Sequence, residues 1–145
     1  MRAARRLLVS WRVPSVLHQI LVELFRNCGE LAPELLRRCA EIVIEHDRVT
    51  LGSIDLSQVA STEYRADAVV ELRGLDDTVV AAVIVEVQLS TDADKPYTWP
   101  LYITALRAKL TCPVTLLVIT TEDSVARWAK KPIALGHPGS ASRRW

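Results

Sequence analysis

A carboxylate and an amide stand two residues apart near the end of the most apolar stretch of this sequence. Residues 79–89 (VVAAVIVEVQL) are almost entirely valine, isoleucine and alanine until Glu86 and Gln88 appear. Such a run predicts a strand that is buried on both faces. Side chains two residues apart on a strand project from the same face, so we expect Glu86 and Gln88 to point the same way. A carboxylate buried at the end of a strand requires a cation or hydrogen-bond donors beside it.

A second carboxylate, Asp67, lies in the preceding apolar run, residues 64–72 (YRADAVVEL). The two runs are joined by residues 73–78 (RGLDDT), whose glycine and aspartates favour a β-hairpin turn. If the runs pair as neighbouring strands, Asp67 comes close to Glu86 at one edge of the sheet. Two adjacent carboxylates are ligands of the kind that hard cations such as Mg²⁺ prefer.

Composition limits the class of protein. The chain has 145 residues, half of them hydrophobic, which is enough for one domain with its own core. A formal net charge of +1 gives no global basic field of the kind that many DNA-binding proteins carry, although a local basic cleft stays open. Cys28, Cys39 and Cys112 lack a Cys-x-x-Cys spacing and are predicted to be buried thiols. Since no apolar run reaches the roughly 18 residues that cross a bilayer, we expect a soluble, cytoplasmic protein.

The chain divides into three segments. Residues 1–13 are Arg-rich without an acid, and we interpret them as a disordered leader or as the product of translation starting upstream of the domain. Residues 14–133 form the expected folded domain. Residues 134–145 are rich in glycine, proline and serine and are predicted to be a flexible tail.

The domain is expected to open with a helix from Pro14, with Ser15 as N-cap and Gly29 as a left-handed C-cap. Helical spacing assigns its core-facing stripe to Leu17, Ile20, Leu21, Leu24 and Phe25. His18 and Glu23 share this helix. Glu23 either reaches a metal site or belongs to a solvated face, and His18 is a weaker candidate ligand.

A second short helix is expected next, with Pro33 in its first turn and with Leu35, Leu36 and Cys39 buried. The β-branched residues 41–51 (EIVIEHDRVTL) then predict a first strand at an edge of the sheet.

Polar residues 90–96 follow the hairpin, and a helix is predicted from about Thr98 to Leu110, with Pro100 in its first turn. Residues 114–119 read as a further buried strand, and residues 122–130 as a short helix. The resulting α-β-β-β-α-β order predicts an α/β fold in which helices flank a mixed sheet.

With these elements in place, the sequence resembles the PD-(D/E)xK nuclease superfamily, and within it the recombination-promoting nucleases and transposase-like proteins of bacteria. The resemblance rests on three motifs within residues 14–133: residues 64–67 (YRAD), residues 85–89 (VEVQL), and Asp94-Lys95 with the Trp99-Pro-x-Tyr102 pattern behind it. It implies a restriction-endonuclease-like sheet.

The resemblance also implies a Mg²⁺-dependent endonuclease that hydrolyses DNA, with Mn²⁺ as a substitute metal. Asp67, Glu86 and the carbonyl of Val87 are the implied metal ligands. The superfamily usually carries lysine at the third motif position, where this chain has Gln88, which can hydrogen-bond a water but adds no charge. Lys95 in the following loop is the nearest replacement cation.

Other residues supply further alternatives. Arg107 and Lys109 on the predicted helix 98–110 are other sources of the missing charge, and Glu23 is a supporting carboxylate. Three classes of function stay open: a metal-dependent DNA endonuclease, as a monomer or a dimer; an inactive nuclease-fold module that binds a protein or nucleic acid; and an unrelated α/β domain. In an inactive fold, Arg65 or Arg107 would pair with the two carboxylates.

Overall fold

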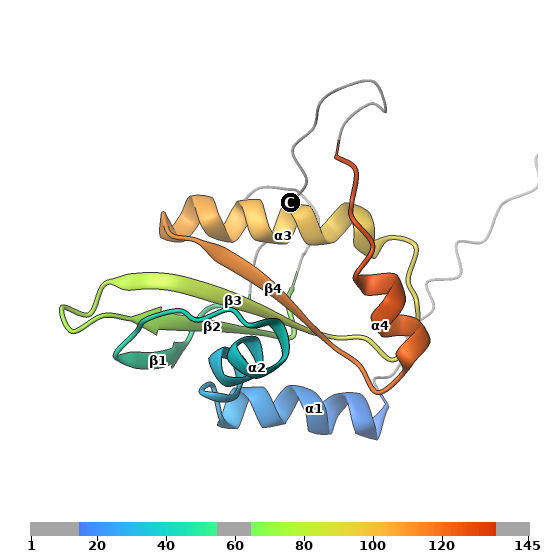
Figure 1. Cartoon of the computed structure of the whole chain (residues 1–145), viewed down its shortest axis with the longest axis horizontal. Helices are drawn as coiled ribbons and strands as arrows, with labels where there is room; N and C mark the ends of the chain where they lie inside the picture. Colours follow the sequence, from blue (N-terminus) through green and yellow to red (C-terminus); the bar gives the residue numbers. More distant parts are fainter. Residues whose placement is uncertain (1–14, 55–64, 136–145) are drawn as a thin grey trace, which may run out of the picture.

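The computed structural model describes residues 15–54 and 65–135, which form eight elements around one four-stranded sheet (Figure 1). In chain order they are α1 (Val16–Asn27), α2 (Leu31–Ala40), β1 (Arg48–Leu51), β2 (Ala68–Arg73), β3 (Val79–Val87), α3 (Lys95–Leu110), β4 (Val114–Ile119) and α4 (Asp123–Ala129). The predicted leader, residues 1–13, and nearly all of the predicted tail lie outside the described residues. No helix in the described part of the chain is long and apolar enough to cross a membrane.

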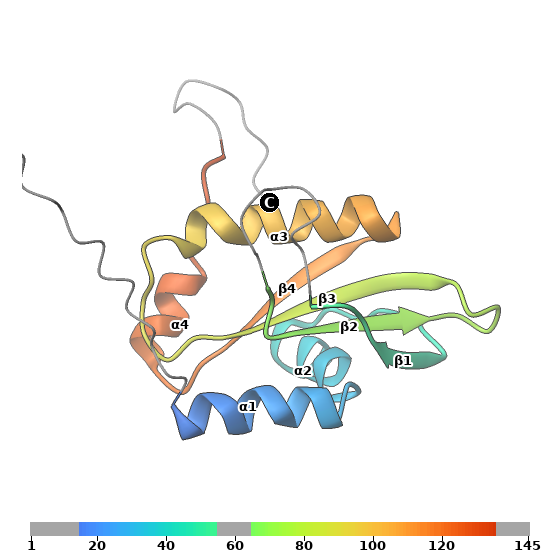
Figure 2. The ribbon, with the colours of Figure 1, turned by 180° about the vertical axis from the view of Figure 1, so that it is seen from behind.

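The sheet is mixed and open, with the strand order β1-β2-β3-β4. The pairs β1–β2 and β2–β3 are antiparallel, whereas β4 runs parallel to β3 after the crossover through α3. Helices α1 and α2 cover one face and α3 covers the other, while α4 lies beside one end of β4 (Figures 1 and 2). The predicted α/β class with a mixed sheet flanked by helices is therefore confirmed.

Alternation along β3 divides the core between these two faces. Ala81, Val83 and Val85 pack with Phe25 and Leu36 beneath α1 and α2. The residues in between, Ala82 and Ile84, pack with Trp99, Tyr102 and Leu106 of α3. The next residue on the α3 face is Glu86. The side-chain alternation that buries Ala82 and Ile84 therefore also buries this carboxylate.

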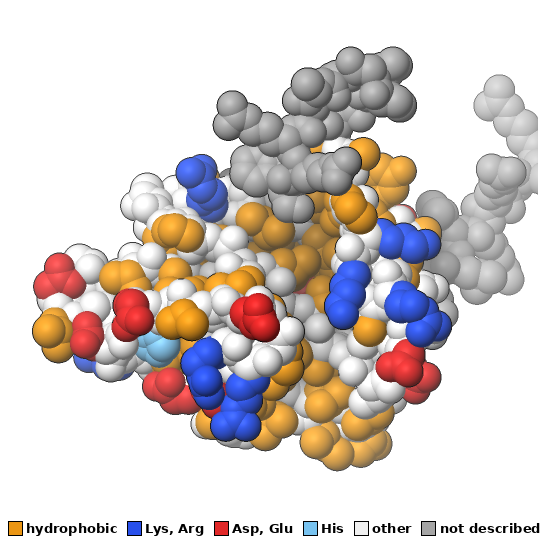
Figure 3. Space-filling model, viewed as in Figure 1, with side chains coloured by type: hydrophobic (Ala, Val, Ile, Leu, Met, Phe, Trp, Pro, Cys, Tyr) orange, Lys and Arg blue, Asp and Glu red, His pale blue; other side chains and the backbone are white. Residues whose placement is uncertain are grey.

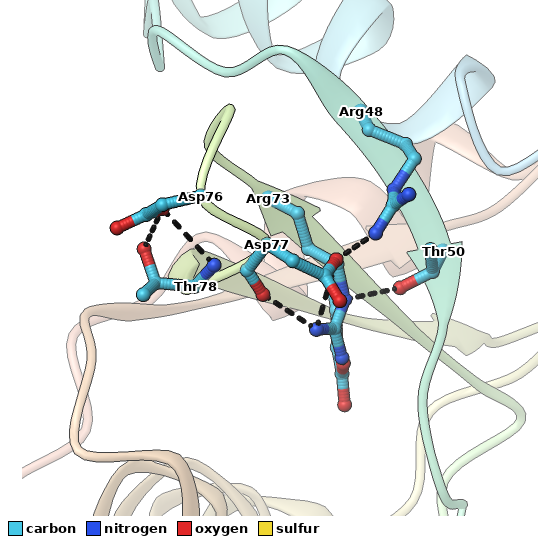
Figure 4. Close-up of polar contacts among 7 residues, drawn as sticks. Arg48, Thr50, Arg73, Asp76, Asp77 and Thr78 are labelled. Atoms are coloured by element: carbon cyan, nitrogen blue, oxygen red, sulfur yellow. Dashed lines mark hydrogen bonds and ion pairs between the residues drawn. The ribbon is translucent and has the colours of Figure 1, made fainter.

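The predicted hairpin is confirmed, and a polar network at its turn helps to fix its register (Figure 4). Arg73 Nε donates to Thr50 Oγ1 at 2.9 Å and Arg73 Nη1 donates to the Asp77 carbonyl at 2.8 Å. Arg73 also pairs with Glu71, and Arg48 of β1 pairs with Asp77. Because a slip of one residue would turn every side chain to the opposite face, this network also governs which residues meet at the other end of the hairpin.

The prediction for the first helix is right about its start and wrong about its buried stripe. Ser15 is the N-cap, and its hydroxyl accepts from the His18 amide at 3.1 Å. The inward face carries Val22 and Phe25, whereas most of the predicted stripe is exposed: Leu17 by 43%, Ile20 by 59% and Leu24 by 47%. The helix is turned so that half-buried His18 faces the sheet, which a count of apolar residues alone does not anticipate.

Several predicted boundaries need correction. The first strand is only Arg48–Leu51: Glu41, at the end of α2, has a left-handed backbone, and residues 42–46 belong to no strand. No described glycine has a positive φ, so Gly29 is not a left-handed cap. Cys28 and Cys39 are exposed, and only Cys112 is buried. Strand β4 is half-buried rather than buried because it is the edge strand.

Helix α3 begins at Lys95, three residues before the predicted start. Pro96 therefore occupies its first turn, where a missing N–H costs nothing, and Pro100 lies inside the helix instead. The earlier start moves Lys95 from a loop onto a helix, which determines where its ammonium points.

A glycine at position 111 is expected to stabilise the fold. Thr111 ends α3 with φ 54°, and β-branched side chains are strained in this left-handed region. We expect Thr111→Gly to raise the free energy of unfolding by about 1 kcal/mol in urea denaturation, since relief of strain exceeds the entropy cost of glycine. Thr121→Gly makes the same change at an exposed position without positive φ and should be neutral or destabilising. Equal effects of both substitutions would contradict the strain at Thr111.

Candidate functional site

The site begins with Asp67, at the bend that leads into β2. Its Oδ2 accepts a hydrogen bond from the Val87 amide at 2.8 Å. The backbone pairing of β2 with β3 ends at the pair Ala68 and Val85. Next to this pair, the Asp67 side chain accepts the hydrogen bond from the β3 backbone. The hairpin thus brings Asp67 to the end of β3 that carries Glu86, as the sequence predicted.

Glu86 lies on the α3 face and is 1% exposed. Its Oε2 accepts a hydrogen bond from Lys95 Nζ at 2.6 Å, and the resulting ion pair is largely buried. Its Oε1 is buried and has no hydrogen-bond partner among residues 15–54 and 65–135. The described part of the site therefore satisfies one oxygen of this carboxylate and leaves the other open.

Burial raises the pKa of Glu86 above its ordinary value, and the nearby charge of Asp67 adds to this rise. The Lys95 ammonium opposes it, as does the Trp99 indole, which approaches the carboxylate. Trp99 Nε1 nevertheless makes no hydrogen bond with proper geometry in the described part of the chain. Burial by itself would lower the pKa of Lys95, but the Glu86 carboxylate outweighs burial and raises this pKa. Lys95 therefore stays an ammonium at neutral pH.

Gln88 continues the same face. It is 9% exposed, and its backbone N–H donates to the Ile119 carbonyl at 2.8 Å, which extends the pairing with β4 by one residue. Strand alternation predicts that the Gln88 side chain lies on the side of Glu86. The cation beside Glu86 nonetheless comes from α3 and not from the third motif position.

On the other side of Asp67, helix α1 forms a small polar pocket. His18 Nε2 lies 3.6 Å from Asp67 Oδ1, and Arg26 Nε donates to the Asp67 carbonyl at 3.2 Å. Arg26 also pairs with Glu23 at 3.3 Å. His18, Glu23, Arg26 and Asp67 line a cavity of about 420 Å³ together with Gln19 and Val22. Glu23 is thus on the rim of the site, about one and a half helical turns beyond His18.

One predicted association, that of Arg107 with the carboxylates, is not seen. Arg107 lies more than three turns along α3 from Lys95, where it lines a separate cavity of about 580 Å³, and it does not pair with Glu86.

Two neighbours of the carboxylates were underrated or missed by the sequence reasoning. His18 and Val22 are four residues apart and share the inward face of α1. This spacing indicates the inward face only if polar residues are counted together with apolar ones. For Trp99 beside Glu86 the sequence holds no comparable signal.

The functional groups of the side chains at the site are two carboxylates, a carboxamide and an ammonium. No group of three or more His, Cys, Asp or Glu side chains in the described residues is arranged to hold a metal ion. Any metal here would therefore rely on two carboxylates, backbone oxygen and water.

No family model matches the chain, and neither a curated protein nor a solved structure matches it.

Proposed function

We propose that this chain is a Mg²⁺-dependent endonuclease of the PD-(D/E)xK type that hydrolyses DNA phosphodiester bonds. The observation that carries the proposal is the Glu86 carboxylate. It is buried at the end of a central strand, it faces a lysine with one oxygen, and its other oxygen has no partner in the described residues. A buried ion pair adds little or no stability compared with apolar residues of the same volume, so its presence favours a functional role, and raised pKa values gather at functional sites.

The order of the elements supports the proposal. The resemblance implies an α-β-β-β-α-β arrangement with an acid at the start of one hairpin strand and Glu-x-Gln on the next. Asp67 precedes β2, Glu86 is on β3, and α3 crosses over to the parallel β4. A restriction-endonuclease-like identity of the sheet is part of this proposal.

The donor set suits a hard cation. Asp67, Glu86 and the Val87 carbonyl offer oxygen only, and Mg²⁺ typically takes one or two carboxylates and keeps several waters. The missing third side-chain ligand is therefore no obstacle, and Glu23 borders the cavity that Asp67 lines. When bound, the metal would polarise the phosphoryl oxygen and acidify a bound water.

The roles of the protein's own residues follow from their charges. Lys95 is held as an ammonium, so at neutral pH it stabilises negative charge developing on the phosphate and does not act as a base. Gln88 adds no charge and is suited to orienting a water by hydrogen bonding. Asp67 is fixed by the Val87 amide, which keeps its second oxygen directed at the α1 pocket.

One observation favours a second candidate, an inactive nuclease-fold module that binds a protein or nucleic acid. The Lys95–Glu86 pair at 2.6 Å already neutralises the buried carboxylate without a metal. In that case the pair is a structural ion pair. Divalent metal distinguishes the two candidates because only the first predicts that metal binds at the carboxylates.

A metal titration tests the proposal. At 100 times the dissociation constant, Mg²⁺ or Mn²⁺ is expected to stabilise the fold by about 2.7 kcal/mol, measured as a shift in melting temperature, and the same samples should nick supercoiled DNA. Asp67→Asn should lose most of the shift because it removes one ligand charge. Glu122→Gln removes an exposed carboxylate at the N-cap of α4 and should keep the shift. A melting temperature indifferent to both metals, with DNA left intact, would select the inactive module.

A further inference from the structure

Apart from Arg65, the lysine and arginine side chains that the structure describes fall into two groups. Those on β1, β2, α1, α2 and at the start of α3 are paired with acids: Arg26, Arg37, Arg38, Arg48, Arg73 and Lys95. Those farther along α3 and on or just after α4 have no acidic partner among residues 15–54 and 65–135: Arg107, Lys109, Arg127, Lys130 and Lys131. Unpaired cations therefore gather on the α3–α4 side of the molecule, although the net charge of the whole chain is only +1.

Between α3 and α4 runs a groove with an apolar floor, which we call the α3–α4 groove. It consists of two adjoining cavities of about 490 and 580 Å³ that share Trp99, Lys131 and Ile133 in their walls. Ile103, Leu116 and Ile133 contribute to its floor, and Arg107, Lys130 and Lys131 are its charged wall residues. No described acidic side chain lines either cavity. Lysine and arginine side chains gather over α4, with hydrophobic side chains beside them toward α3 (Figure 3).

The groove is connected to the carboxylate site through two aromatic residues. Trp99 lines both cavities, acts on the pKa of Glu86, and lies 5.2 Å from the Trp128 ring, centroid to centroid. Tyr97 lines the cavity nearer to Lys95, two residues away on α3, and it is 83% exposed. The groove thus presents an exposed aromatic ring at Tyr97 and is bordered by Trp99, the residue that it shares with the surroundings of Glu86.

We propose that the α3–α4 groove binds an unpaired nucleic-acid strand and leads it to the carboxylate site. Its phosphates contact Lys130, Lys131 and Arg107, and a base stacks on Tyr97. A single strand exposes both base faces and phosphates, which matches cations beside an apolar and aromatic floor. A duplex offers only its phosphates to such a surface, because its bases are already stacked. The inference deepens the proposed function, on which it rests, by naming an unpaired strand as the substrate.

Binding can be measured without cleavage, so the inference and the proposed function can fail separately. The probe is a fluorescein-labelled thymidine oligomer of about 12 nucleotides, followed by fluorescence anisotropy in EDTA, with a hairpin duplex for comparison. We expect the single strand to bind more tightly than the duplex. Lys130→Ala/Lys131→Ala should weaken binding about tenfold or more and reduce the slope of log K against log salt by about 1.4, at 0.7 per lost phosphate contact. Tyr97→Ala should weaken binding about fivefold or more.

The matched control is Arg37→Ala/Arg38→Ala, which removes the same charge from α2, where both arginines pair with Glu34. It should leave binding unchanged. Equal losses in the two double variants would reduce the effect to net charge and overturn the groove. Tighter binding of the duplex with a silent Tyr97→Ala would overturn the unpaired strand. Displacement of the oligomer by an acidic amphipathic peptide at lower concentration than by unlabelled strand would reassign the groove to a protein partner. Strand binding without metal-dependent cleavage would leave the groove standing and remove the endonuclease.

Discussion

The Lys95→Met variant is expected to lose about 3–5 kcal/mol of its free energy of unfolding at neutral pH, because removing one partner of a buried ion pair leaves the other charge uncompensated. Glu86 is 1% exposed and Lys95 is its ion-pair partner in the structure, at 2.6 Å. Urea denaturation followed by circular dichroism measures the loss.

The pH dependence of this variant has a definite sign. Without Lys95, burial raises the pKa of Glu86 further above its ordinary 4.5. A carboxyl with a raised pKa binds its proton more tightly in the folded state, so the variant should regain stability as the pH falls through the folded pKa toward 4.5. In the wild type, the raised pKa of Lys95 sets an upper pH limit on the stability that Lys95 contributes. The contribution that Lys95 makes to stability by binding its proton more tightly in the folded state is complete below 10.5 and is lost as the pH rises through the folded pKa of Lys95.

Two variants control this result. Glu86→Gln/Lys95→Met removes both charges and should recover most of the lost stability, because no unpaired charge stays buried. Lys130→Met makes the same lysine substitution at an exposed position and should change little. If Lys95→Met unfolds at the same urea concentration as the wild type at neutral pH, the ion pair does not stabilise the fold.

The Asp67→Asn variant is expected to cleave DNA about 10²–10⁴-fold more slowly than the wild type, while its stability without metal changes little. In the wild type, the Val87 amide donates to Asp67 at 2.8 Å. Asparagine keeps an oxygen that can accept this hydrogen bond, and it loses only the charge. The readout is single-turnover nicking of supercoiled DNA with Mn²⁺, since that substrate needs no known sequence.

The comparison with Asp67→Ala separates chemistry from structure. Alanine removes the hydrogen bond as well, so this variant should lose activity and also some stability, by about 1–3 kcal/mol for an unsatisfied amide. Gln88→Ala should be slower than the wild type by less than Asp67→Asn, because Lys95 already supplies the positive charge beside Glu86. Wild-type rates in Asp67→Asn would remove Asp67 from the reaction.

The parts of the fold predicted correctly from the sequence are those that local patterns determine. The hairpin follows from two apolar runs with Gly74 between them, and Ser15 caps α1 because a hydroxyl at that position reaches the first turn. The strand Val114–Ile119 was placed correctly, but its burial depends on what lies next to it in the sheet, which a local pattern does not contain.

The parts predicted wrongly depend on tertiary contacts. In its observed rotation, α1 buries Val22 and Phe25 and sets His18 and Arg26 against Asp67, 41 residues from Arg26 in the chain. The early start of α3 places Lys95 in the first turn of the helix, where its ammonium pairs with Glu86 on β3. Both cases concern polar residues whose placement a hydrophobic count leaves open.

The two carboxylates differ in what they contribute to the fold, and this difference affects how each position would drift among descendants. Asp67 accepts the Val87 amide, so it retains a structural value if activity is lost. Glu86 is buried with a raised pKa and needs Lys95 to offset it, so without selection for activity a neutral replacement of both would be accepted readily. Among descendants, an aspartate at position 67 would therefore persist in working and inactive chains alike, whereas loss of the acid at position 86 would mark the lineages in which the chemistry had ceased.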